Sequence, residues 1–182
     1  MAPPEVELHR AAPARTRPPA QRPLVLGRRT FPPDELVVMA TVNRTPDSFY
    51  DRGATYGAAA AVAAAERALG AGAAIIDIGG VKAGRGAHVS VAQEIDRVVE
   101  VIATVRQRRP DAVISIDTWR AEVAAAAVAA GADLLNDAWE GHDRRLARVA
   151  TETGVGWCAH TPGTCRRART STIPSTTTSS PT

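Results

Sequence analysis

The chain has 182 residues, of which 45% are hydrophobic, enough to build the core of one ordinary domain. The formal net charge is +3, but its two ends carry the excess, and residues 36–160 hold 13 basic and 15 acidic residues. Since a nucleic-acid-binding domain carries positive charge on its folded part, this distribution argues against a nucleic-acid partner. No run approaches the roughly 20 apolar residues that span a membrane, so no membrane association is expected.

The two ends of the chain have compositions typical of disorder. Residues 1–35 are rich in arginine and proline, and we expect a disordered extension because they offer little apolar surface to bury. Residues 161–182 are mostly Thr, Ser, Pro and Arg and predict a low-complexity tail. The start has no apolar stretch typical of a secretory signal, and Cys158 and Cys165 form no disulfide or zinc pattern. A cytoplasmic protein with free thiols is the expectation.

Residues 36–160, between these ends, alternate between strand and helix patterns. The apolar run 36–42 predicts a buried strand, and the alanine-rich segment from about 58 to 69 predicts a helix that ends at the following glycines. A second strand is predicted over 73–79. Ser90 then begins a helix, with Gln93 placed to complete a capping box. The buried face of this helix is expected to consist of Val91, Ile95, Val98, Ile102 and Val105.

The same alternation continues after Pro110, which ends that helix. The later elements are strands at 112–117, 132–137 and 155–160 and helices at about 119–130 and from Asp143 to about 151. Strands that alternate with helices predict right-handed βαβ units and a parallel sheet. A complete TIM barrel needs roughly 250 residues, so these five strands predict an α/β fold that is the N-terminal portion of a (β/α)-barrel.

Polar residues gather at the C-terminal ends of the predicted strands, where barrels of this kind have their active sites. They are Asn43, Thr45, Asp47 and Ser48 after the first strand, Asp77, then Asp117 and Thr118, Asn136 and Asp137, and His160. Each alone has a local explanation, and we expect Thr118 and Asp143 to cap helices. Because four of the five strand ends carry Asn or Asp, we interpret the set as a ligand-binding site.

The residue types at these strand ends indicate which ligands fit. An aspartate beside an asparagine can match the donors and acceptors of an aminopyrimidinone ring. Asn43 offers a neutral oxygen, which suits a hard cation such as Mg²⁺. The sequence contains no Ser–His–Asp series, no paired-cysteine metal site and no Walker-type glycine loop.

Four segments occur in the order and spacing of a known set of signatures. The most specific is VMATVNRTPDSFYDRG (38–53), an apolar strand followed by N-x-T-P-D-S-F-x-D. The others are GAAIIDIGG (72–80), ISIDT (114–118) and LLNDAW (134–139). Over about residues 36–160 the chain resembles the dihydropteroate synthase family.

The resemblance implies a TIM barrel and a transferase of folate biosynthesis. That family joins 6-hydroxymethyl-7,8-dihydropterin diphosphate to para-aminobenzoate and releases pyrophosphate, with Mg²⁺ on the diphosphate. By motif, Asn43 would bind Mg²⁺ and the diphosphate, Asp117 and Asn136 would bind the pterin ring, and Asp77 would support the pocket. No catalytic residue is assigned.

One loop and the C-terminal end depart from the family pattern. After Gly80 the family continues E-S-T-R-P-G, whereas this chain has V-K-A-G-R-G, so Ala83 and Gly84 replace the Thr and Arg that contact the diphosphate. A nearby lysine or arginine does not reproduce a bidentate arginine at a fixed place. The loop resembles the divergent second synthase-like copy of some bacteria. Residues 161–182 match none of the family's later strands, so we expect a C-terminally truncated, inactive homologue.

Two other interpretations stay open. The chain is alternatively a non-catalytic pterin-binding or interaction remnant, or another pterin-binding barrel such as a corrinoid-linked methyltransferase, which the long first motif disfavours. The first and fifth predicted strands would have free edges, which indicates possible self-association.

Overall fold

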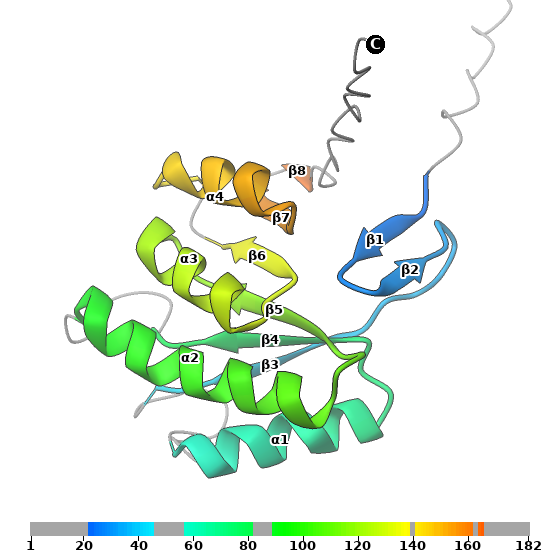
Figure 1. The fold of residues 1–182 in the computed structure, drawn as a ribbon. Coiled ribbons are helices and arrows are strands. Elements are labelled where there is room, and N and C mark those ends of the chain that lie inside the picture. Colours follow the sequence, from blue (N-terminus) through cyan, green and yellow to red (C-terminus); the bar gives the residue numbers. More distant parts are fainter. Residues whose placement is uncertain (1–21, 46–56, 82–88, 139–140, 162–163, 166–182) are drawn as a thin grey trace, which may run out of the picture.

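Five parallel strands alternate with four helices along one side of the sheet, as Figure 1 shows for the computed structural model. The structure describes residues 22–45, 57–81, 89–138, 141–161 and 164–165. The parallel strands, in spatial order, are β3 (Met39–Asn43), β4 (Ile75–Gly79), β5 (Val113–Asp117), β6 (Leu134–Asp137) and β7 (Gly156–Thr161). The helices are α1 (Ala58–Gly70), α2 (Val91–Arg108), α3 (Ala121–Ala130) and α4 (Arg145–Thr153). The predicted α/β alternation is confirmed.

The two faces of the sheet differ in character because side chains alternate along each strand. The face toward the helices is apolar, with Ile76, Ile78, Ile114 and Ile116 fully buried against residues of α1, α2 and α3. The opposite face carries polar side chains, among them Asp77 and Ser115. The hydrophobic core therefore lies between the sheet and the helices. The opposite, polar face of the sheet is available for ligand binding.

Helix α2 has the start that the sequence predicts. The Ser90 hydroxyl accepts the Gln93 amide at 3.2 Å, and the Gln93 side chain accepts the Ser90 amide at 2.9 Å, which completes the capping box. Val98, Ile102 and Val105 are buried as expected. Position 94 is also buried, although the residue there is a glutamate.

A two-stranded hairpin closes the end of the sheet at which the parallel strands begin (Figure 1). It consists of β1 (Leu24–Leu26) and β2 (Arg29–Phe31), with Gly27 in its turn at φ 55°, a left-handed value that favours glycine. Leu26 and Phe31 are almost completely buried and pack with Ile75, Val113 and Leu134.

The expected disorder of residues 1–35 is therefore wrong for residues 22–35. Strands of three residues are too short to show periodicity, and the two buried side chains gain their free energy from contacts distant in sequence. Residues 1–21 lie outside the described part. In the predicted tail, β8 (Thr164–Cys165) pairs antiparallel with β7, and residues 166–182 also lie outside it. Among the described residues, no helix combines the length and apolar character needed to cross a membrane.

Candidate functional site

The parallel register brings the predicted site residues into one row at the ends of the strands. Asn43 pairs with Gly79, Gly79 with Asp117, and Asp117 with Asn136. Residues that pair in register point to the same face of a sheet, here the face away from the helices. We call Asn43, Asp77, Asp117 and Asn136 the strand-end cluster.

Asp77 links residues of the cluster from a position two residues before Gly79 on β4. It lies in the middle of β4 rather than at its end, which corrects the expectation from sequence, and it is buried. Its Oδ1 accepts the Ser115 hydroxyl at 2.6 Å, and its Oδ2 accepts the Asn136 amide Nδ2 at 3.0 Å. Burial raises the pKa of Asp77, and these two hydrogen bonds act in the opposite direction. Asp77 thus holds the side-chain amide of Asn136 in place through a hydrogen bond.

Gly79 leaves open space between Asn43 and Asp117. A side-chain carbon at position 79 would lie 2.8 Å from Oδ1 of Asn43 and 3.7 Å from Oδ2 of Asp117. The two oxygens therefore face the same small volume, which any other residue at position 79 would occupy.

Asp117 has a largely buried carboxyl group with three other acidic residues near it. Burial, together with the negative charges of Asp77, Glu94 and Asp137, raises its pKa to about 7. Its Oδ1 is buried and has no hydrogen-bond partner among the described residues. A buried polar atom without a partner costs free energy, so a ligand that donates an N–H to this oxygen would be bound favourably.

Other predicted strand-end residues lie apart from the cluster. Asp137 is fully buried but follows Asn136, so it points to the opposite face of the sheet. Thr45 is buried, whereas Asp47 and Ser48 lie outside the described residues. His160 belongs to β7, but its side chain is outside the described part.

The two residues expected to cap helices are not the N-cap residues, which are Arg120 for α3 and Arg144 for α4. Asp143 nevertheless accepts the Arg145 amide at 3.0 Å at the start of α4 and the Ala121 amide at 3.1 Å at the start of α3. Thr118 is buried and donates its hydroxyl to Glu94, while accepting the Arg120 amide at 3.2 Å.

Glu94 and Arg120 lie behind the strand-end cluster and are not among the site residues that the sequence predicts. Glu94 lies between Val91 and Val98 at helical spacing. A charged residue on the apolar face of α2 is the sequence feature that indicates a special role for this position. Burial raises the pKa of Glu94, while contacts with Thr118 and Arg120 lower it.

The donor set suits a hard cation only in part. Among the described residues, no group of three or more His, Cys, Asp or Glu side chains could hold a metal ion. Asn43 and Asp117 nevertheless direct oxygens at one space, and Mg²⁺ is commonly held by one or two protein oxygens together with substrate phosphates. The residues fit a cation that arrives with a phosphorylated ligand, rather than a resident ion in a protein cage.

Comparison with known proteins gives a consistent family. Residues 39–178 match the family model described as pterin binding enzyme. The chain is 56% identical over 137 residues to inactive dihydropteroate synthase 2 of Mycobacterium tuberculosis, covering 75% of this chain and 43% of the relative. It is 44% identical over 117 residues to the dihydropteroate synthase of Streptococcus pyogenes, covering 63% of this chain and 44% of the relative.

A solved structure has the same arrangement of strands and helices. The Yersinia pestis dihydropteroate synthase, in complex with a sulfonamide drug, matches with a TM-score of 0.70 and 37% identity, over 78% of this chain and 52% of that chain. The five parallel strands and four helices therefore correspond to part of a TIM-type barrel. The chain spans less than half the length of the curated relatives and about half of this structure.

Proposed function

The chain belongs to the pterin-binding enzyme family, as a relative of the dihydropteroate synthases, and on this basis we propose that the strand-end cluster binds a pterin. The observation that carries the proposal is the buried, unpartnered Oδ1 of Asp117 next to Asn136. The pyrimidinone edge of a pterin presents an N–H and an amino group, both donors, beside a carbonyl. Asp117 would accept from these donors.

Asn136 would complete the recognition of the ring. Its Nδ2 already donates to Asp77, so its side-chain Oδ1 and its second N–H remain to face a ligand. Asp77, fixed by Ser115, would hold the amide of Asn136 in one orientation. The cluster would thus offer two acceptors and one donor to the ring edge.

We propose the substrate from the same family relationship. The pterin would carry a diphosphate on its hydroxymethyl group and be joined to para-aminobenzoate, with pyrophosphate as the leaving group. Mg²⁺, when bound, would stabilise the charge of the leaving pyrophosphate. Asn43 would supply a neutral oxygen to this ion, on the side of the site above Gly79.

We further propose that this chain binds the pterin without completing the reaction. Ala83 and Gly84 lack the hydroxyl and guanidinium groups that the family places on the diphosphate. The relative in Mycobacterium tuberculosis, at 56% identity, is itself named inactive. Loss of one electrostatic donor commonly costs on the order of a hundred-fold in rate, so two losses at one diphosphate would remove turnover. The chain is then a pterin-binding protein rather than a catalyst.

Titration of the purified chain with a dihydropterin, followed by a pyrophosphate-release assay with the pterin diphosphate, para-aminobenzoate and Mg²⁺, tests both proposals. We expect saturable binding and no release. Asp117→Ala should weaken binding roughly ten-fold or more, since it removes a buried acceptor. Asp111→Ala, which removes an exposed carboxylate in the turn after α2, is the matched control. Equal affinity of Asp117→Ala and the parent would reject the site, and substrate-dependent release would reject the inactivity.

A further inference from the structure

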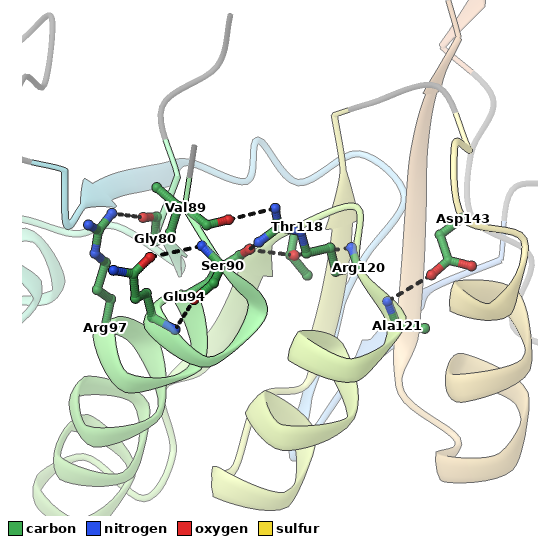
Figure 2. A network of polar contacts seen from close by, with 10 residues as sticks. Gly80, Val89, Ser90, Glu94, Arg97, Thr118, Arg120, Ala121 and Asp143 are labelled. Atoms are coloured by element: carbon green, nitrogen blue, oxygen red, sulfur yellow. Dashed lines mark hydrogen bonds and ion pairs between the residues drawn. The ribbon is translucent and has the colours of Figure 1, made fainter. Parts of the chain in front are cut away.

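Glu94 is a fully buried glutamate in the first turns of α2, immediately behind the strand ends. Figure 2 shows its carboxylate between two side chains from the β5–α3 connection. Its Oε1 accepts the hydroxyl of Thr118 at 2.7 Å, and its Oε2 accepts Nη1 of Arg120 at 2.7 Å. Both oxygens are therefore satisfied by the residues that directly follow Asp117 and Trp119 in the chain.

The same network holds the backbone on both sides of the β4–α2 connection. Arg120 donates through Nη2 to the carbonyl of Val89 at 2.8 Å, just before α2. Arg97, one turn after Glu94, donates to the carbonyl of Gly80 at 2.8 Å, just after β4 (Figure 2). Arg97 of α2 thus fixes the end of β4, and Arg120 of the β5–α3 connection fixes the start of α2.

The consecutive glycines at the end of β4 separate this network from the ligand side. A side-chain carbon at Gly80 would lie 2.9 Å from Cγ1 of Val98 and 3.1 Å from Cγ of Glu94, so Gly80 packs directly on the glutamate. Gly79, one residue earlier, adjoins Asn43 and Asp117. Glu94 therefore contacts the immediate chain neighbours of both Gly79 and Asp117.

A buried ion pair is a poor way to gain stability alone. Removing two charges from water is costly, and apolar side chains of similar volume often serve as well or better. The rest of the buried face of α2 is in fact apolar, with Val98, Val101 and Ile102 in it. Glu94 and Arg120 form their ion pair beside the strand-end cluster. We therefore expect the pair to have a role in the site as well as in packing.

We propose that Glu94 is a positioning residue of the pterin site: through Thr118 and Arg120 it sets Asp117 of β5 against the Gly79–Gly80 end of β4. The inference rests on the proposed function for its ligand. Glu94 does not touch the ligand space, so it acts through Asp117. Its effect on binding is then conditional on Asp117 being present.

A double-mutant cycle on the full chain tests this dependence, with a dihydropterin as the probe. Glu94→Gln keeps the shape of the side chain and an acceptor for Thr118 but loses the ion pair with Arg120. We expect it to weaken pterin affinity roughly ten-fold in the parent. In an Asp117→Ala background, the same change should alter the residual affinity by no more than about two-fold.

Glu66→Gln is the matched control, because it removes another glutamate that pairs with an arginine, Arg108, at 3.3 Å on the surface. It should leave affinity unchanged. Thr118→Val is a second variant that keeps the ion pair and removes only the hydroxyl; we expect a smaller loss, again absent in the Asp117→Ala background. A loss that is as large without Asp117 as with it, or no loss in Glu94→Gln, would overturn the proposal.

Hydrogen exchange in the ligand-free chain separates this inference from the proposed function. Glu94→Gln should accelerate exchange of the Thr118 and Arg120 amides by roughly ten-fold relative to the parent, since both belong to the network, and should leave the amides of α4 unchanged. A parent that binds no pterin would reject the proposed function alone. Unchanged exchange at Thr118 and Arg120 would reject the positioning role whether or not the pterin binds.

Discussion

Asn136 on β6 donates a hydrogen bond of 3.0 Å to Asp77 on β4, across the intervening strand β5. The same carboxylate accepts the Ser115 hydroxyl of β5 at 2.6 Å, so one side chain joins three adjacent strands. The bonds run along the face of the sheet opposite the helices, and no helix of the described part packs on that face. Asp77 therefore contributes both to the shape of the site and to the cohesion of the sheet.

Removal of the Asn136 amide should destabilise the fold as well as the site. In Asn136→Ala, Oδ2 of the buried Asp77 loses its partner, and we expect the free energy of unfolding to fall by about 1–3 kcal/mol. Urea denaturation measures this change. Thr153→Ala, which removes an exposed hydroxyl bonded to the carbonyl of Val149, should cost no more than about 0.5 kcal/mol. A cost for Asn136→Ala as small as that of the control would contradict the assigned hydrogen bond.

Stability should depend on pH through Asp117. Burial and the negative charges of neighbouring carboxylates raise the pKa of Asp117 from 3.8 to about 7, so the folded chain keeps a proton that the unfolded chain releases between these values. The free energy of unfolding should therefore fall as the pH rises through this window and become independent of this group above it. The Asp117→Asn variant should lack this part of the slope. Urea denaturation of both proteins at about pH 4.5 and about pH 7.5 compares them, and parallel slopes would contradict the raised pKa.

Gly80 should tolerate no side chain, because the space beside it is filled by α2. In Gly80→Ala, the new methyl group would meet Val98, Glu94 and the backbone oxygen of Glu94, 3.3 Å away. We expect a loss of about 1–3 kcal/mol in unfolding free energy from overpacking. Gly70→Ala is the control, since nothing lies within 4 Å of the added carbon at the end of α1. Thermal unfolding of the two variants should give clearly different midpoints, and equal midpoints would argue against the tight contact of β4 and α2.

The N-terminal hairpin should be required for stability through one face only. Leu26 is 2% exposed and packs against the N-terminal ends of the parallel strands. Leu26→Ala should therefore lower the free energy of unfolding by about 2–5 kcal/mol. Val25, its neighbour in β1, is 52% exposed, and Val25→Ala should change stability by no more than about 0.5 kcal/mol. Chemical denaturation of both proteins checks this alternation. Equal small effects would contradict the packing of Leu26 against the sheet.

Self-association is expected along β3, which has β4 as its one strand neighbour among the described residues. Leu36 and Met39 are exposed at 88% and 42%, so the edge of the sheet presents apolar side chains beside free backbone groups. Sedimentation velocity of the 182-residue chain should reveal species larger than a monomer. Met39→Lys should shift the distribution toward the monomer, because a charge on an edge strand opposes pairing. Thr151→Lys on exposed α4 adds the same charge as a control, and a monomeric parent would contradict the prediction.

The sequence by itself determined the order of the strands and helices, because the signals for these elements are local. Period-3.6 stripes, the Ser90–Gln93 capping box and the glycines after helices act within a few residues of one another. It also placed Asn43, Asp117 and Asn136 at strand ends, since those residues directly follow apolar runs. Only the tertiary structure decided that Asp77 bonds to Asn136, that Glu94 lies behind Asp117, and that Leu26 and Phe31 close the base of the sheet. These contacts join residues 24 to more than 100 positions apart, and their free energy comes from burial and pairing that no local pattern encodes.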